Sequence, residues 1–340
     1  MSLAFRELCQ KLSFVALGIT DAKPPAYYEF YQKAVQRGLP PNLQYLVRGA
    51  EFRKDFTALL PETKSILCVA LPIPAVPKNS PLLWASFCAL PDYHAVMREK
   101  LGVVLEWLRE NTPVQRARIC VDSAPILERE LASRAKLGFC ARNQNLILPN
   151  FGSFVVLAEL LIDYDLYAER ENYEFGLCHE PVVRLCDKGC TACVAACPTK
   201  ALTRAGYAPE RCIAYWNTQH KGAIPADIAR AMGARVWGCD TCQSVCPYNR
   251  GKRRELASFV LADLGVEDIL TSSASKLRKR FKGSALDGAH PYILQRNACI
   301  VMANLGLANC EKWLKDMDLH PCDWVRAAAK DALVRLNTEN

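Results

Sequence analysis

The sequence predicts an α+β fold built in three successive parts. Over the first 165 residues, short apolar runs of strand type alternate with helical stretches, a pattern typical of layered α/β or α+β domains. Eight of the 17 cysteines then fall between residues 186 and 247. From about residue 256 onward, turns become fewer and helical periodicity dominates. We therefore expect three domains, over residues 1–170, 171–255 and 256–340.

The composition is that of an ordinary globular protein. Of the 340 residues, 51% are hydrophobic and 23% are charged, so the chain can bury a sizeable core. No apolar run reaches the roughly 18 residues that would indicate a membrane span. The stretch from Met1 to Gln10 also lacks the basic-then-apolar layout of a signal peptide. We expect a cytoplasmic protein with no membrane partner.

Three apolar runs and one helical stretch organise the first part. The run from Ser65 to Leu71 is short, partly β-branched and ended by Pro72, as a buried strand would be. Two further runs, Ala117 to Val121 and Phe154 to Ile162, predict strands of the same kind. The stretch from Tyr93 to Glu110 carries apolar residues at helical spacing and predicts a helix.

Asp122 lies where a predicted strand ends and a helix through Ile126 to Ala132 begins. Strand ends beside helix starts are where layered folds gather functional groups. A carboxylate that only caps the helix is the alternative interpretation. Because the chain has only five histidines, a carboxylic acid whose pKa is raised by enclosure is the better candidate for a proton donor.

Two similar helical stretches predict a repeat in the last part. They run from Gln295 to Gly306 and from Val325 to Leu336, and their arginines, Arg296 and Arg326, lie 30 residues apart. HEAT-like repeats have this style, in which paired helices stack into a curved surface.

Basic residues give the chain a formal charge of +8, with concentrations at Lys252 to Arg254 and at Lys276 to Lys282. A basic surface can attract nucleic acid by releasing counterions. A solvated face without a partner is the alternative.

The middle part carries two ferredoxin-like cysteine groups. Clustered cysteines in a chain that is not secreted indicate metal ligands rather than disulfides. Three closely spaced thiolates cap one iron–sulfur cluster, while a fourth, followed by proline, ligates the neighbouring cluster. Two such groups predict two [4Fe–4S] clusters with exchanged ligands. The groups are Cys186-x3-Cys190-x2-Cys193-x3-Cys197-Pro198, and Cys212 with Cys239-x2-Cys242-x3-Cys246-Pro247.

Two other metal sites compete with this interpretation. Cys-x2-Cys pairs also bind zinc, although a zinc site has no use for a further cysteine at x3 followed by proline. Cys186, Cys190 and Cys193 alone have the spacing of radical S-adenosylmethionine enzymes. Those enzymes use three lone cysteines, whereas Cys197 follows here at once.

Familiar nucleotide motifs are missing from the sequence. It has neither a G-x-G-x-x-G after a strand nor a G-x-x-x-x-G-K loop. The stretch from Asp92 to Met97 begins like the D-x-H-x-x-G module that binds base-off cobalamin, but it lacks the glycine. His94 is therefore interpreted as a packed or capping residue rather than a cobalt ligand.

Several short motifs together resemble one family. They are Asp92-Tyr93-His94, Val121 to Glu128, Gly152-Ser153-Phe154, Cys190 to Cys193, Ala196 to Thr199, Arg211-Cys212-Ile213, His220 to Pro225 and Gly238 to Pro247. In this order they resemble the epoxyqueuosine reductases, from about residue 40 to the C-terminus.

The resemblance implies a fold, an activity and partners. Residues 1–170 would form a reductive-dehalogenase-like domain that binds cobalamin, 171–255 a ferredoxin-like domain with two [4Fe–4S] clusters, and 256–340 a HEAT-like domain that contacts tRNA. The implied reaction reduces epoxyqueuosine at the tRNA wobble position to queuosine. The implied partners are a tRNA carrying epoxyqueuosine in its anticodon and an external low-potential electron donor, and we expect a monomer.

The resemblance also implies residue roles. Asp122 matches the aspartate that protonates the departing epoxide oxygen. Arg296 and Arg326 become candidates for tRNA contact, with an inter-repeat structural role as the alternative for Arg326. One cluster would be held by Cys186, Cys190, Cys193 and Cys246, and the other by Cys197, Cys212, Cys239 and Cys242. Cobalamin would be surrounded by Arg53, Tyr93, Asp122, Ser153, Glu159 and Asp240.

The chain departs from the family pattern in three places. The family has Cys-x2-Cys at the first pair, so Cys186 ligates after a local bulge or Cys178 takes its place. Members read Gly-Trp-x-Gly-Lys where this chain has Gly138 to Arg142, and Arg-Tyr where it has Ser86-Phe87. Two other functions stay open: a cobalamin-dependent reductase of a small molecule, such as a reductive dehalogenase, and an electron-transfer protein with no substrate site.

Overall fold

The computed structural model describes residues 2–76, 81–169, 186–252, 264–307 and 311–338. Two of the sequence interpretations lie outside these residues. They are the substitution of Cys178 for Cys186 and the basic pair Arg253-Arg254. None of the helices in the described ranges is both long and apolar enough to span a membrane.

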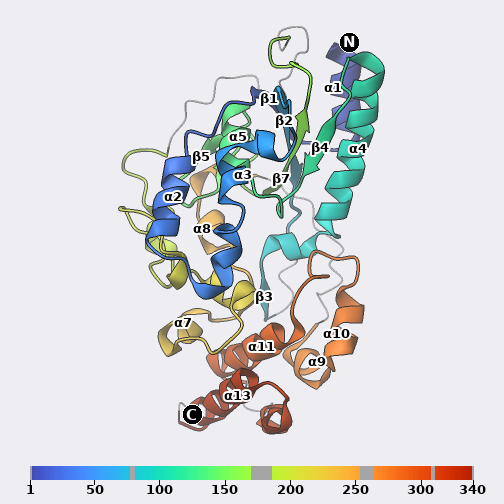
Figure 1. Cartoon of the computed structure of the whole chain (residues 1–340). Coiled ribbons are helices and arrows are strands. Elements are labelled where there is room, and N and C mark those ends of the chain that lie inside the picture. Colours follow the sequence, from blue (N-terminus) through green and yellow to red (C-terminus); the bar gives the residue numbers. More distant parts are fainter. Residues whose placement is uncertain (1, 77–80, 170–185, 253–263, 308–310, 339–340) are drawn as a thin grey trace.

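The first part is built on a four-stranded antiparallel sheet in the order β1-β2-β7-β4 (Figure 1). Three of its strands confirm the sequence prediction to within one residue, whereas β1 was not predicted. The strands are β1 (Ala16–Asp21), β2 (Ser65–Pro72), β4 (Ala117–Cys120) and β7 (Val155–Ile162).

Both faces of the sheet are covered by helices. Side chains of a strand point alternately to its two faces, so Leu67 and Val69 of β2 pack toward one core while Ile66 and Cys68 pack toward another. This explains why β2 is apolar throughout. The first core includes α1 (Ser2–Lys11) and α4 (Tyr93–Asn111), and the second includes α3 (Ala50–Lys54), η2 (Phe56–Ala58) and α5 (Glu128–Arg134).

Short elements connect this sheet to the cysteine-bearing segment. Strand β3 (Leu83–Trp84) pairs in parallel with β8 (Arg235–Trp237), which joins the first part to the second. The hairpin of β5 (Phe139–Cys140) and β6 (Leu146–Ile147) shares a small core with Cys246. The other elements are α2 (Tyr28–Gln36), η1 (Pro41–Leu46), η3 (Ser86–Ala89), α6 (Ala192–Ala196), η5 (Pro209–Arg211), the π-helix η6 (Tyr215–Gln219), α7 (Ala226–Ala231), α8 (Thr241–Ser244) and η7 (Pro247–Asn249).

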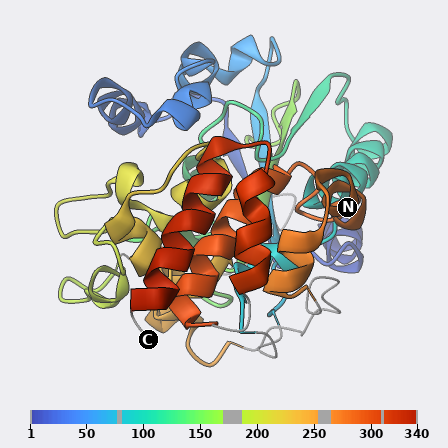
Figure 2. The same cartoon turned by 90° about the horizontal axis from the view of Figure 1, so that it is seen from below.

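The last part is helical, as predicted. Its two long helices, α11 (Pro291–Leu305) and α13 (Asp323–Thr338), lie side by side (Figure 2). Their core also contains Trp84 of β3 and Trp237 of β8, so it extends across residue 255. The remaining elements are α9 (Val266–Thr271), α10 (Ala274–Phe281), α12 (Glu311–Asp316) and η9 (Met317–Leu319).

Arg296 connects this helical part to the cysteine-bearing segment by hydrogen bonds. It is completely buried, and its guanidinium donates hydrogen bonds to the carbonyls of Trp216, His220 and Gly222 at 2.6–2.8 Å. The prediction that Arg296 contacts tRNA is therefore wrong, because no atom of the side chain reaches the surface. Arg326 is half-buried and donates to the His320 carbonyl at 2.6 Å, which favours the structural interpretation for this residue too.

Candidate functional site

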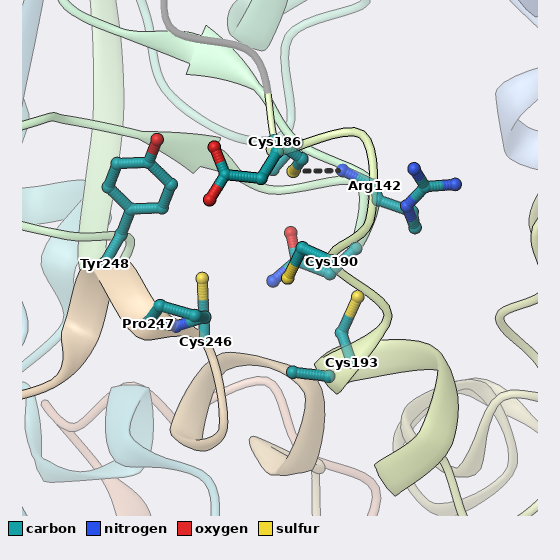
Figure 3. Close-up of a pocket in the computed structure, with 11 residues that line it drawn as sticks. Arg142, Cys186, Cys190, Cys193, Cys246, Pro247 and Tyr248 are labelled. Carbon is teal, nitrogen blue, oxygen red and sulfur yellow. Dashed lines mark hydrogen bonds between the residues drawn. The ribbon is translucent and has the colours of Figure 1, made fainter.

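Four cysteines line one pocket, although they come from two segments of the chain (Figure 3). Cys186 and Cys190 precede α6, Cys193 lies in it, and Cys246 follows α8. In the close-up their sulfur atoms surround a common space. The structure thus brings together the set Cys186, Cys190, Cys193 and Cys246 that the resemblance implied.

The extra residue after Cys186 is absorbed locally. The N–H of Cys190 donates to the carbonyl of Asp187 at 2.9 Å, which closes a turn between the two cysteines. The Cys186 sulfur accepts a hydrogen bond from the backbone N–H of Arg142, with 3.5 Å between the two atoms. Cys186 therefore reaches the pocket despite its wider spacing.

The second cysteine group lies next to the first, and its thiols influence one another's pKa values. The pKa of Cys242 is raised to about 12, mainly by burial and also by the nearby Cys239, Cys212, Cys193 and Asp240. Burial would also raise the pKa of Cys197, but hydrogen bonds from the backbone of Leu202, Thr199 and Ala201 and from the Thr199 hydroxyl lower it overall. Because Cys193 belongs to the first group, the two groups adjoin.

A third cluster of side chains surrounds Asp122, whose carboxylate is exposed over 59% of its surface. The Tyr93 hydroxyl donates to Asp122 Oδ2 at 2.7 Å, and His94 Nε2 lies 3.3 Å from the same oxygen. The backbone of Asp122 has φ +45°, a left-handed conformation that costs energy for a residue other than glycine. Its N–H donates to Glu128 Oε1 at 2.7 Å, which holds this conformation.

Two carboxyl groups stand behind Asp122, those of the half-buried Glu128 and the buried Glu159. The pKa of Glu128 is raised to about 7, mainly by desolvation and also by the charge of Asp122, while the hydrogen bond from the Asp122 N–H and the charge of Arg129 act in the opposite direction. Glu159 is completely buried in β7, and burial raises its pKa well above the usual range, with Glu128 contributing. In the described part of the chain, its carboxyl oxygens have no hydrogen-bond partner.

A cavity of about 830 Å³ borders the Asp122 site. Tyr93 and His94, the two partners of Asp122, lie in its wall. The opposite walls come from η6, α10 and the start of α11. The walls also contain the aromatic residues Phe87 and Trp237 and the basic residues Arg98, Lys221 and Arg278.

The structure distributes the remaining predicted site residues over three places. Ser153 and Asp240 lie at the seam between the first two parts: the Ser153 hydroxyl donates to Gln243 Oε1 at 2.9 Å, and Asp240 Oδ2 accepts from the Ser86 N–H at 2.7 Å. Arg53 donates hydrogen bonds to the backbone carbonyls of Leu46, Arg48 and Gly49 at 3.1–3.3 Å. Glu159 lies in strand β7, inside the sheet. Only Tyr93 is brought directly to Asp122.

Sequence reasoning gave no role at this site to His94 and Glu128. The N-cap of this helix is Asp92, whose side chain accepts the His94 N–H, whereas the His94 ring reaches Asp122. Glu128 follows Asp122 by six residues, and its role depends on the left-handed turn at Asp122. The sequence carried a signal for both, since each lies within a motif of the family resemblance.

Comparisons with known proteins agree with this geometry. A family model described as "4Fe-4S double cluster binding domain" matches residues 186–249, and one described as "Epoxyqueuosine reductase QueG, DUF1730" matches residues 53–123. Curated proteins named epoxyqueuosine reductase are similar to the chain. The one from Synechococcus sp. CC9605 is 31% identical over 313 residues, which cover 88% of this chain and 93% of that protein.

Other relatives are matched over less of their length. The epoxyqueuosine reductase of Bacillus subtilis is 33% identical over 72% of this chain, and that of Escherichia coli K12 is 34% identical over 71%. The matches span 64% and 63% of those two proteins.

Solved structures of epoxyqueuosine reductases have the same fold. One, in complex with an epoxyqueuosine-modified tRNA-Tyr stem loop, is 26% identical, has a TM-score of 0.85, and covers 98% of this chain and 89% of its own. Another, from Bacillus subtilis, has its catalytic aspartate loop swung out of the active site. It is 25% identical, with a TM-score of 0.80 and coverage of 98% and 90%.

Proposed function

This chain belongs to the epoxyqueuosine reductase family, and we propose that it reduces epoxyqueuosine in the tRNA anticodon to queuosine. The observation that carries the proposal is the arrangement at Asp122, an exposed carboxyl group held by Tyr93 and His94 at the edge of a large cavity. An electron-transfer protein without a substrate would have no use for such a group. The tRNA stem loop bound by a relative supports tRNA as the substrate class.

The proposed reaction consumes two electrons and two protons for each epoxide, and yields an alkene and water. Iron–sulfur clusters carry one electron at a time, and two of them suit this demand. We assign Cys186, Cys190, Cys193 and Cys246 to one cluster, on the basis of their shared pocket. Cys197, Cys212, Cys239 and Cys242 are assigned to the other. An external low-potential donor would supply the electrons.

The large cavity is our proposed site for cobalamin. Its volume lies within the range of about 300–1,000 Å³ that is typical of cofactor sites, and its walls carry both apolar and polar residues. Phe87 and Trp237 offer apolar surface, while Lys221 and Arg278 can pair with the phosphate of the nucleotide tail. Tyr93 would lie at the edge nearest Asp122, with Ser153 and Asp240 along the seam. Cobalamin, when bound, supplies a strongly reducing cobalt centre.

Asp122 acts as the proton donor in this proposal. Its exposed carboxyl group can reach a substrate, and it delivers a proton to the departing epoxide oxygen. Tyr93 and His94 both contact Oδ2, which leaves Oδ1 directed to the substrate. The relative with a displaced aspartate loop suggests that the loop around Asp122 moves here too, and the left-handed backbone at Asp122 supports this.

We propose that the basic helix α10 forms the tRNA-binding surface of the last part, and that α11 and α13 stack behind it as a HEAT-like repeat. Helix α10 ends with Arg278, Lys279 and Arg280 in its last turn, which suits the phosphate backbone. A cytoplasmic, monomeric enzyme would agree with this substrate.

The proposed function can be tested in bacterial cells that lack their own epoxyqueuosine reductase. Expression of this chain should replace epoxyqueuosine by queuosine in total tRNA, as measured by nucleoside mass spectrometry. Unchanged epoxyqueuosine, despite soluble protein with its iron bound, would overturn the proposal.

A further inference from the structure

Helix α2 and the following η1 expose an unusual number of aromatic side chains. Phe30 is 66% exposed, Tyr27 49% and Tyr45 47%. Single exposed apolar residues are normal on a protein surface, but here three large rings lie within 19 residues. Helix α2 itself has no buried residue and stands at the edge of the molecule (Figure 2).

The contacts that anchor this segment to the rest of the protein do not involve its exposed rings. The buried carboxylate of Glu130 accepts the N–H groups of Ala26 and Tyr27 at 2.6 and 3.0 Å, which anchors the start of α2. At the other end, the Tyr31 hydroxyl donates to the Leu46 carbonyl. Arg53 braces the turn between η1 and α3 and lies over the Tyr31 ring at 5.5 Å. The exposed faces of Phe30 and Tyr45 therefore remain available to a partner.

Basic side chains lie on the same segment as these rings. Lys33 lies over the Phe30 ring at 5.9 Å, and Arg37 and Arg48 are exposed on the same segment. Glu29 and Glu51 are the acidic residues of α2 and α3. Aromatic rings interleaved with cationic groups are typical of surfaces that bind single-stranded RNA, where unpaired bases stack on the rings and the cations face the phosphates.

The segment also adjoins the catalytic loop. Burial raises the pKa of Tyr45, and the charge of Asp122 contributes to this rise. At Gly49, which has φ +77°, a Cβ atom would lie only 3.2 Å from Pro125 of the Asp122 loop. A base that stacks on this segment would thus be a close neighbour of the base that Asp122 serves.

We propose that α2 and η1 form a stacking platform for the unpaired anticodon-loop bases that flank the modified nucleotide, with Phe30 and Tyr45 as its stacking rings. The platform rests on the proposed function, because it takes tRNA as the substrate. It adds a binding site for single-stranded RNA in the first part of the chain, apart from the basic helix α10.

Fluorescence anisotropy with two labelled RNAs tests the platform. One RNA is an anticodon stem loop, and the other is the same stem extended into a continuous duplex. Phe30→Ala and Tyr45→Ala should each weaken binding of the stem loop about 5-fold or more, as expected for the loss of one stacked base. Both variants should bind the duplex like the wild type, and Phe30→Trp should restore stem-loop binding. Val103→Ala is the matched control, because it removes an exposed apolar side chain from α4.

The possible outcomes separate the platform from the proposed function. Equal stem-loop affinity in the wild type and both alanine variants would overturn the platform alone. An equal loss on the stem loop and the duplex would also overturn it, since stacking on unpaired bases would then not be the cause. If the wild-type chain binds neither RNA, the proposed function falls together with the platform.

Discussion

Asp122 is the proposed proton donor, and its position depends on its neighbours. The left-handed backbone at Asp122 is held by Glu128, while Tyr93 and His94 fix one carboxyl oxygen. The sequence singles out Asp122 as a candidate by its place at the end of a predicted strand. The contribution of Glu128 could not, because it arises only when φ at Asp122 becomes positive.

The carboxyl group of Glu128 should make stability depend on pH. Its pKa in the folded protein is about 7, against an ordinary value of 4.5. The folded state therefore binds the extra proton, and stability is lost as the pH rises from about 4.5 through 7. Relative to Glu128→Gln, the free energy of unfolding of the wild type should fall by about 3 kcal/mol between pH 4.5 and 8.

Urea denaturation at several pH values measures this difference. Glu106→Gln, on the exposed side of α4, is the control and should keep the pH dependence of the wild type. If the free energy of unfolding changed with pH in the same way in the wild type and in Glu128→Gln, the pKa of Glu128 would not be raised in the folded protein.

At the scale of elements, apolar periodicity predicted β2, β4, β7 and α4 with small errors, because each is buried along a regular pattern. Strand β1 was not recognised. Its Gly18 packs so closely that a Cβ atom would lie 2.0 Å from the Ala135 carbonyl oxygen, a contact between distant segments that no local pattern encodes. Helix α2 was not predicted either, and it differs from α4 in that it buries no residue.

The cysteine groups were predictable because cluster ligation imposes a local spacing. The family resemblance was misleading for Arg296, which it made a candidate for tRNA contact. Its burial follows from the approach of α11 to the segment of η6, which the sequence does not reveal.

Arg296 should matter for stability rather than for RNA binding. Arg296→Met leaves the carbonyls of Trp216, His220 and Gly222 without their donor, and each buried unsatisfied acceptor costs about 1–3 kcal/mol. We expect a loss of about 3 kcal/mol or more in the free energy of unfolding, measured by urea denaturation. Arg326→Met removes a donor to one carbonyl and should cost about 1 kcal/mol. Equal losses in the two variants would contradict this role for Arg296.

At the scale of the whole molecule, the three parts meet where the cofactors are proposed. The cysteine-bearing segment is joined to the sheet through β3 and β8 and to the last helices through Arg296. The large cavity takes its walls from all three parts. In the proposed function, this arrangement would bring the electron carriers, the cofactor and the proton donor together in one continuous structure.

The cofactor content follows from the two cysteine groups. Protein reconstituted anaerobically with iron, sulfide and cobalamin should contain about eight irons per chain, four in each cluster. It should also show a cob(II)alamin signal in its EPR spectrum. A plateau near four irons would limit the protein to one cluster, and a missing cobalt signal would remove cobalamin from the cavity.

The most direct test of the central claim compares Asp122→Asn with the wild type on purified tRNA that carries epoxyqueuosine. Both proteins are loaded with iron and cobalamin, supplied with a low-potential reductant, and followed by mass spectrometry of the released nucleosides. The wild type should form queuosine, whereas Asp122→Asn should form none while it retains its iron, its cobalamin and its affinity for the tRNA. Queuosine formation by Asp122→Asn at the rate of the wild type would contradict the assignment of Asp122 as the proton donor.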